Sequence, residues 1–492
     1  MFVLPLLSFA DVWRANRATQ GPAMAFRSSP NAPSLDSTLQ TYDFFFVQWL
    51  DWMGTLRARC VPAKEFIHLL KEDKLRFGIS RGNLGTLQND TSTPVCVPVG
   101  QIYVRPDLAS MKMMYQGKRP ERCASILASF EEEDGSPVDL CPRSCLAETV
   151  RAIHAEYDIA FLVGFEVEVT FCKRVDGAFQ PLDQDHAWAT FTDQQYTNAF
   201  PLMLKITKAL SDIGIDVQQV HSEAGAGQYE FVLPPLPPVE AVDTLVQARQ
   251  AIQHIAAARE LRATYHPQPF PGIGTACHAN ISFNSAKDPN VLEKEQMSFM
   301  SAVLDHLPSL CAFTMPEEVS YGRVLDNSWT SGTWVAWGTQ NRETPLRRVD
   351  DKNGLSSRWE MRCIDGIPNM YLVLHALLRV GLAGLRSGDQ IKLGDCLSKS
   401  SPLCARPVSC RADLSTGNPA HLSDTERTTL GIVQKLPTSL EQSLASLRDD
   451  VAVQQAIGTH VVDHYVSMKD AEQAMLGKLS EKERHVWFME RC

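Results

Sequence analysis

The segment 161–171, FLVGFEVEVTF, alternates so strictly that it fits a β-strand with one apolar and one polar face. The strand period places Glu166 and Glu168 side by side on the polar face, about 7 Å apart. Two carboxylates this close repel each other unless positive charge neutralises them. One divalent cation, or a pair of them, is the simplest candidate. An exposed sheet edge is the alternative, although the opposite face is too apolar for an isolated strand.

Three other segments show the same alternation, 228–232, 278–283 and 356–365. Each places acids, a histidine or arginines on one face, which is unusual in a core because carboxylates are rarely buried without a partner or a metal. An exposed sheet face would explain any one of them, but together the four strands predict a polar cavity. Its acidic side comprises Glu166, Glu168, Glu223, Glu230, Glu360 and His278, and its basic side comprises Arg342, Arg347, Arg358 and Arg362.

The acidic side of this cavity suits hard divalent cations such as Mg²⁺ or Mn²⁺, which prefer oxygen ligands. Metals that face several arginines are what phosphoryl transfer requires, because the metals bridge phosphate oxygens and the guanidinium groups stabilise the transferred charge. The arginines could also hold the carboxylate of a substrate. The residues alone therefore predict a metal-dependent enzyme that acts on a phosphate and a carboxylate.

The composition limits the class of protein. The chain has 492 residues, enough for two or three domains, and its 44% hydrophobic and 21% charged residues are typical of a soluble globular protein. A net charge of −10 argues against nucleic acid as a partner. Thirteen scattered cysteines without zinc-like spacing indicate reduced thiols in the cytoplasm. We find no segment long and apolar enough to cross a membrane and expect no membrane partner.

The N-terminal 40 residues are expected to form a disordered extension, with 28–37 as a flexible linker. Two other interpretations stay open. The apolar residues 1–10 resemble the core of a weak signal peptide, and the arginines within 11–35 resemble those of a mitochondrial transit peptide.

Two domains are expected after this extension. Residues 41–135 predict a small α+β domain dominated by a sheet, in which a bend at Asp51 joins two strands. Residues 136–492 predict a larger domain that contains the polar cavity and becomes helical from about Pro368.

Several motifs occur in the order found in one enzyme family, namely WLDWMG, VRPDL, CPRS, GFEVEV, HSEAGAGQYEF, NRETPLR and RWEMRCID. With them the chain, from about Tyr42 to its C-terminus, resembles the glutamine synthetase family, closest to the bacterial-type branch and its fungal relatives. The resemblance implies an α+β fold, with an N-terminal β-grasp domain and a catalytic domain built on a curved antiparallel sheet, or half-barrel, with C-terminal helices. It also implies a homo-oligomeric ring, a dodecamer or similar, with active sites between subunits.

The resemblance also implies roles for individual residues by motif position. The ligands of a first metal ion would be Glu168, Glu223 and Glu230, and those of a second would be Glu166, His278 and Glu360. The phosphate-stabilising arginines would be Arg342, Arg347 and Arg362. Arg323 would hold the carboxylate of glutamate, and Asp51 would reach the adjacent subunit's site near its ammonium pocket. The remaining substrate contacts would be Gly274, Asn280, Ser282 and Arg358.

The implied reaction has two steps. The γ-carboxylate of glutamate attacks ATP to give γ-glutamyl phosphate and ADP, and an amine then displaces phosphate. Trp329 stands where the family's loop glutamate, which helps to deprotonate ammonium, is expected, and no carboxylate lies between Asp326 and Glu343. The other departures from the family pattern are Gln268, Ile273, Asn280 and Gln434. Three outcomes stay open, namely ammonia as acceptor, an organic amine that gives a γ-glutamylamide, or a regulatory protein without turnover.

Overall fold

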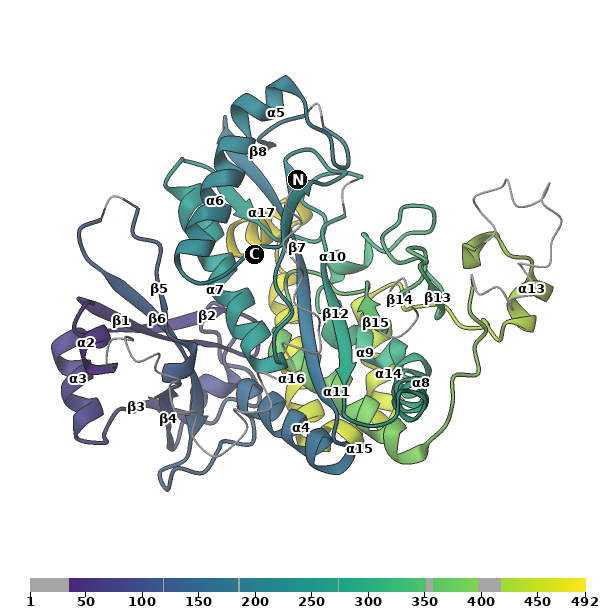
Figure 1. Ribbon diagram of the computed structural model, residues 1–492, viewed down its shortest axis with the longest axis horizontal. Coiled ribbons are helices and arrows are strands. Elements are labelled where there is room, and N and C mark those ends of the chain that lie inside the picture. Colours follow the sequence, from purple (N-terminus) through teal and green to yellow (C-terminus); the bar gives the residue numbers. More distant parts are fainter. Residues whose placement is uncertain (1–34, 118, 185, 273, 351–356, 397–416) are drawn as a thin grey trace.

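The computed structural model describes residues 35–117, 119–184, 186–272, 274–350, 357–396 and 417–492 (Figure 1). The expected N-terminal targeting signals and Ile273 therefore lie outside the described residues. The expected linker is partly wrong, because a short helix, α2 (Leu35–Leu39), begins inside it. Leu39 is fully buried in the same apolar cluster as Phe45 and Phe66, and this burial gives the helix a reason to form.

The N-terminal domain is built on one mixed sheet. Among the described residues it has six strands in the order β2-β1-β6-β4-β3, with β5 paired to β6. Strands β1 and β2 form the predicted pair around the bend at Asp51, and Phe45 of β1 stacks on Phe66 of α3 with ring centroids 4.2 Å apart. The elements are β1 (Phe44–Leu50), β2 (Leu56–Pro62), α3 (Ala63–Lys71), β3 (Phe77–Ser80), η1 (Arg81–Gly85), β4 (Gln101–Pro106), η2 (Leu108–Ser110), β5 (Lys112–Met113) and β6 (Cys123–Glu131).

The second domain is organised around the long strand β7 (Ala160–Val175), which contains the predicted segment 161–171. Within the described chain its sheet has nine strands, in the order β13-β14-β15-β12-β7-β10-β9, with β8 and β11 also paired to β7. The pairs from β14 to β9 are antiparallel, whereas β13 runs parallel to β14. The other strands are β8 (Ala178–Pro181), β9 (Gln219–Ser222), β10 (Gln228–Val232), β11 (Arg262–Thr264), β12 (Cys277–Asn284), β13 (Trp337–Thr339), β14 (Leu346–Asp350) and β15 (Ser357–Met361).

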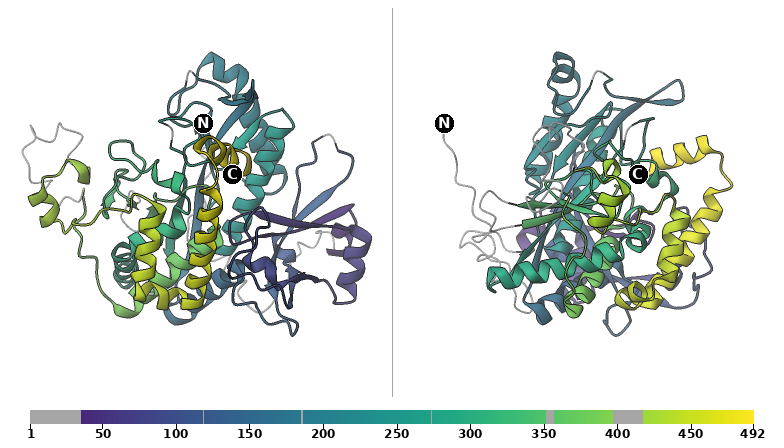
Figure 2. Two further views of the ribbon diagram at one scale, coloured as in Figure 1. Left: turned by 180° about the vertical axis from the view of Figure 1, so that it is seen from behind. Right: turned by 90° about the vertical axis from the view of Figure 1, so that its right-hand side faces the viewer.

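Helices cover the sheet of the second domain, and the C-terminal ones lie behind it in the view of Figure 1 (Figure 2). The predicted helical C-terminal part is present in the described residues from α11 onward. The helices are α4 (Pro142–Tyr157), α5 (Asp193–Asn198), α6 (Phe200–Asp212), α7 (Pro238–Ala257), α8 (Pro289–Asp305), α9 (Leu307–Thr314), α10 (Glu318–Tyr321), α11 (Met370–Ser387), η4 (Pro419–His421), α13 (Asp424–Thr429), α14 (Leu440–Asp449), α15 (Val451–Ile457), α16 (Thr459–Leu476) and α17 (Glu481–Arg491).

Helix α11 is long and apolar enough to cross a membrane by length and composition, which corrects the expectation that no segment is. In the fold, however, 78% of this helix is buried. It packs against α4, α8, α9 and α15. Its apolar sequence is thus accounted for by its position in the core of the second domain.

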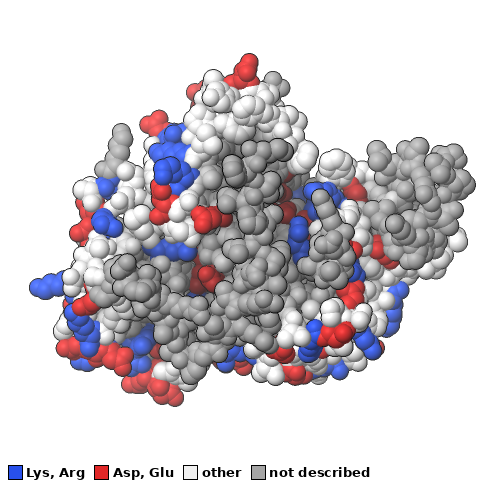
Figure 3. Space-filling view, in the orientation of Figure 1, with Lys and Arg blue, Asp and Glu red and all other residues white. Residues whose placement is uncertain are grey.

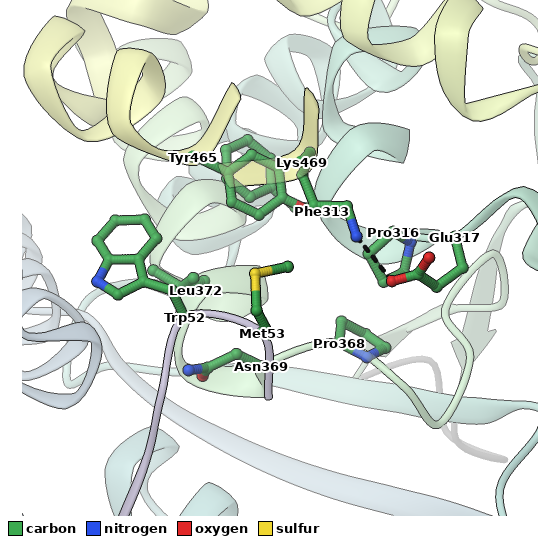
Figure 4. Close-up of a pocket in the computed structure, with 10 residues that line it drawn as sticks. All are labelled: Trp52, Met53, Phe313, Pro316, Glu317, Pro368, Asn369, Leu372, Tyr465 and Lys469. Atoms are coloured by element: carbon green, nitrogen blue, oxygen red, sulfur yellow. Dashed lines mark hydrogen bonds and ion pairs between the residues drawn. The ribbon is translucent and has the colours of Figure 1, made fainter. Parts of the chain in front are cut away.

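A buried ionic triad of Lys469, Glu317 and Glu472 lies where the two domains meet, and Figure 4 shows two of its members, Lys469 and Glu317. Lys469 of α16 contacts the carboxylates of Glu317, at 2.7 Å, and Glu472. Gln88 of the N-terminal domain donates to Glu472 at 2.7 Å, and Trp52 and Lys469 line the same small cavity. This triad therefore joins the turn-rich part of the N-terminal domain to the C-terminal helices.

Candidate active site

The polar faces of five neighbouring strands, β15, β12, β7, β10 and β9, lie together on one side of the second sheet. The register places His278 opposite Glu166, and Glu230 opposite both Glu168 and His221. The other face of β7 is a core layer in which Phe161, Val163, Phe165, Val167, Val169 and Phe171 are at most 2% exposed. Burial of this apolar face fixes the register, because a slip of one residue would turn the carboxylates into the core.

A first group of potential metal ligands consists of Glu166, His278 and Glu360, each with one ligand atom within 4.8 Å of the others. His278 Nδ1 lies 3.4 Å from Glu166 Oε2 and 3.5 Å from Glu360 Oε1. His278 Nε2 is buried without a hydrogen-bond partner among the described residues. These three residues are the set predicted for one metal ion, and the structure brings them together.

Two arginines balance the charge of this group. Arg347 Nη1 donates to Glu360 Oε2 at 2.8 Å, and Arg362 Nη1 donates to Glu360 Oε1. Burial acts to raise the pKa of Glu166. The hydrogen bond and the charge of His278 outweigh this effect, and together with a hydrogen bond from Asn280 and the charge of Arg362 they lower the pKa to about 2. The Glu166 carboxylate is thus held in its ionised form, which is the form that binds metals.

A second group consists of His221, Glu223 and Glu230, again with ligand atoms within 4.8 Å of one another. His221 Nε2 lies 3.0 Å from Glu223 Oε1 and 3.8 Å from Glu230 Oε1. Sequence reasoning missed His221, although its spacing of two from Glu223 was a usable signal. The cluster thus contains His221, which was not predicted, together with the predicted Glu223 and Glu230.

Glu168 lies next to this second group but its carboxylate has other partners. Glu168 Oε2 accepts hydrogen bonds from Gln228 Nε2 at 2.9 Å and from the Ala276 N–H at 2.7 Å. Glu230 lies opposite Glu168 in the β7–β10 register. The role of Glu168 as a metal ligand stays a prediction.

The electrostatics of the second group favour a bound cation. Glu230 is buried, and burial together with the carboxylates of Glu166, Glu168, Glu223 and Glu360 raises its pKa to about 10. A cation at this position would relieve the repulsion between these carboxylates. Oxygen-rich donors with one imidazole fit Mg²⁺ or Mn²⁺.

The predicted arginines take different positions. Arg323 is 2% exposed and donates to the backbone carbonyls of Arg362, at 3.0 Å, and Thr330, at 3.4 Å. Burial lowers its pKa from the ordinary value. Arg342 is exposed and, among the described residues, makes no ion pair. The basic side therefore includes Arg323, Arg347 and Arg362, whereas Arg342 is exposed.

The remaining predicted substrate contacts lie along the same face. Asn280 links the two sides, because its amide donates to Glu166 Oε1 at 2.9 Å and accepts from Arg358 Nε at 2.9 Å. Ser282 is 8% exposed and lies opposite Arg358 in the β12–β15 register. The carbonyl of Gly274 accepts from Gln228 at 2.9 Å. Their contacts with a substrate stay predictions.

Two of the departures from the family pattern also have positions. Trp329 lies in the loop 325–333 with its side chain 68% exposed, and its carbonyl accepts from Arg362 Nη2 at 2.6 Å. Gln268 donates to the carbonyl of Gly322 at 3.3 Å. The loop that carries Trp329 therefore borders the first metal group.

Asp51 is buried in the bend of the N-terminal sheet, away from both metal groups. Its carboxylate accepts hydrogen bonds from the Met53 and Thr55 backbones and from Arg57 Nε, at 2.9 to 3.0 Å. Burial raises its pKa despite these bonds. Any part in an adjacent subunit's site remains a prediction.

Comparisons with known proteins agree with this architecture. The family model of the glutamine synthetase catalytic domain matches residues 139–400 and 409–490. The chain is 34% identical over 455 residues to protein fluG of Emericella nidulans, covering 91% of this chain but only 48% of that protein. It is 29% identical over 400 residues to a gamma-glutamylpolyamine synthetase of Streptomyces coelicolor, covering 78% of this chain and 79% of the relative.

The likeness extends to solved structures. A crystal structure described as a novel glutamine synthase homolog superposes with a TM-score of 0.72 at 22% identity, covering 94% of this chain and all of the other. This likeness confirms the predicted fold class. The family match covers more than half of the residues and includes the strands that carry both groups of potential metal ligands, and it shows that the chain belongs to the glutamine synthetase family.

Proposed function

We propose that this protein is an ATP-dependent ligase that joins the γ-carboxylate of glutamate to ammonia or an amine through γ-glutamyl phosphate. The observation that carries the proposal is the pair of acid and histidine groups side by side on one sheet face, next to buried arginines. A metal ion in each group would neutralise the phosphate oxygens of ATP. The relative named gamma-glutamylpolyamine synthetase supports a ligase of this class.

The residues of this chain have separate tasks in the proposed reaction. Glu166, Glu360 and His278 hold one Mg²⁺ or Mn²⁺ ion, and Glu223, Glu230, His221 and Glu168 hold the other. Arg347 and Arg362 contact the transferred phosphoryl group, because their guanidinium groups already lie beside the acids. Arg323 is placed to bind the carboxylate of glutamate, since it is buried and its Nε has no partner in the described chain.

A second candidate keeps this chemistry but uses an organic amine. Trp329 gives the loop 325–333 an exposed aromatic side chain where an acid was expected. The two nearest carboxylates in sequence, Asp326 and Glu343, already accept hydrogen bonds from the backbone of the same loop. A binding site with an apolar wall and no free acid favours an alkyl or aryl amine over ammonium.

The test is phosphate release by the purified full chain with ATP, Mg²⁺ and glutamate, offered ammonium or a panel of amines. Release with ammonium supports a glutamine synthetase, and release only with larger amines supports a γ-glutamylamide synthetase. Glu360→Gln should abolish release, whereas Glu156→Gln, an exposed ion-pair residue, should not. Binding of ATP without release for any amine would overturn the ligase proposal and support a regulatory role.

The proposal extends to assembly and location. We infer a homo-oligomeric ring in the cytoplasm, in which Asp51 of one subunit lies near the site of the next. The relatives' family supports this assembly. On the face shown in Figure 3, the described basic and acidic side chains both occur. Light scattering coupled to size exclusion tests the oligomer, and a monomer with full activity would overturn it.

A further inference from the structure

The loop 325–333 has an uncommon backbone. Asn327, Trp329, Ser331 and Gly332 have φ angles of 64°, 56°, 128° and 66°. Only the last is a glycine, and residues with side chains are strained in this left-handed region. Such a conformation persists only where neighbouring groups hold it.

Glu343 provides the contacts that hold Trp329. Its Oε1 accepts the N–H of Trp329 at 3.0 Å, and its Oε2 accepts the N–H of Asn327 at 3.2 Å. The backbone N–H of Glu343 is itself held by Asn341 Oδ1 at 2.9 Å. Because both carboxylate oxygens bond the loop, Glu343 is an anchor for its backbone.

The anchored loop reaches the first metal group through Arg362. The carbonyl of Trp329 accepts from Arg362 Nη2 at 2.6 Å, while Arg362 Nη1 bonds Glu360. Arg362 is 3% exposed, so solvent offers few other partners to its two terminal guanidinium nitrogens. Without the carbonyl of Trp329, the guanidinium of Arg362 would be free to bind Glu360 in a bidentate pair, through both terminal nitrogens. A carboxylate held in this way is a poorer metal ligand.

We propose that Glu343 is a positioning residue that keeps the group Glu166, His278 and Glu360 open to a divalent cation. It does so by holding the loop 325–333, so that Trp329 retains one end of Arg362. The inference rests on the proposed metal-dependent function, but its test measures metal binding and loop exchange directly.

The test uses the purified full chain with Mn²⁺ alone as the probe, with free Mn²⁺ measured by electron paramagnetic resonance. Glu343→Ala should weaken one class of Mn²⁺ site about tenfold, and Glu343→Gln should weaken it less because the amide keeps one acceptor. Asp326→Asn is the matched control. Its carboxylate bonds Thr333 in the same loop, with no contact to Trp329. It should change Mn²⁺ affinity by less than about twofold.

Hydrogen exchange of the peptide 325–333 supplies the second measurement. The amides of Asn327 and Trp329 should exchange faster in both Glu343 variants. Unchanged exchange would overturn the anchoring role, and faster exchange with unchanged Mn²⁺ affinity would overturn the link to the metal group. Equal weakening in Asp326→Asn would also overturn it. A wild-type chain that behaves as expected here but releases no phosphate with any amine would overturn the ligase proposal and leave this role supported.

Discussion

Lys469 is the best position for testing how the two domains are held together, because it is an ammonium group buried against two carboxylates. Lys469 is fully buried, and Glu317 and Glu472 are 4% and 1% exposed. The substitution Lys469→Met keeps most of the side-chain volume and removes the charge. It leaves two buried carboxylates next to each other with Gln88 as the remaining donor to Glu472.

The magnitude follows from this burial. Removing one partner of a buried ion pair costs about 3–5 kcal/mol, because the remaining charge is left uncompensated. For a chain of 492 residues, that corresponds to a fall of roughly 3–5 °C in the unfolding midpoint. The matched control is Lys208→Met, which breaks an exposed pair with Asp212 at 2.8 Å. An exposed pair of this kind contributes about 0–1 kcal/mol.

The stability lost in Lys469→Met should depend on pH in a definite direction. Burial, and then the nearby Glu472, raise the pKa of Glu317 well above its ordinary value, while Lys469 acts against this shift. A carboxyl whose pKa is raised in the folded state binds its proton more tightly there, so stability is lost as pH rises above the unfolded value. Without Lys469 this effect grows. Lys469→Met should therefore be more destabilised at pH 8 than at pH 6.

Thermal unfolding followed by circular dichroism at pH 6, 7 and 8 is the assay. The triple variant Lys469→Met, Glu317→Gln, Glu472→Gln should recover part of the loss, because no buried charge remains. A variant as stable as the wild type at every pH would refute the reasoning. So would a loss that is larger at pH 6 than at pH 8.

Three further predictions concern the site and the fold. Glu360→Gln should weaken Mn²⁺ binding at least tenfold, measured by paramagnetic resonance, with calorimetry used to check that the variant remains folded; unchanged binding would exclude Glu360 as a ligand. Trp329→Glu should lower the KM for ammonium relative to that for larger amines in the phosphate-release assay, and no change in this ratio would separate Trp329 from acceptor choice. Leu39→Ala should cost about 2–5 kcal/mol in urea unfolding, since Leu39 is fully buried; a loss below about 0.5 kcal/mol would show that α2 does not belong to the folded N-terminal domain.

The strands could be predicted from the sequence because their pattern and their register have the same cause. In β7 the six apolar residues demand a buried face, and this demand alone fixes Glu166 and Glu168 on the other face. His221 was missed because β9 is only four residues long and is half exposed, so the spacing of two from Glu223 was the one signal that pointed to it. Its position opposite Glu230 follows from the pairing of β9 with β10, and the periodicity of a single segment cannot reveal such a pairing.

The contacts of the loop 325–333 could not be predicted from the sequence for a different reason. Glu343 lies in a polar segment next to Arg342, and nothing in that segment indicates that its carboxylate returns to Asn327 and Trp329. Helix α2 was missed because its two leucines are too few to give a periodic pattern. The Glu343 hydrogen bonds and helix α2 both depend on tertiary packing, which overrides the conformational preference of the local sequence.

The proposed chemistry and the proposed choice of acceptor are carried by different kinds of structure. The acids and the histidine of the metal groups stand on paired strands whose register is fixed by a buried face, so most substitutions elsewhere leave their spacing intact. Trp329 stands on a loop that donates hydrogen bonds to Glu343 and accepts one from Arg362. Loops on a rigid scaffold change more readily than the scaffold itself. A chain of this family can therefore keep phosphoryl transfer while its acceptor changes, and the loop 325–333 is where this protein departs from the pattern expected for ammonium.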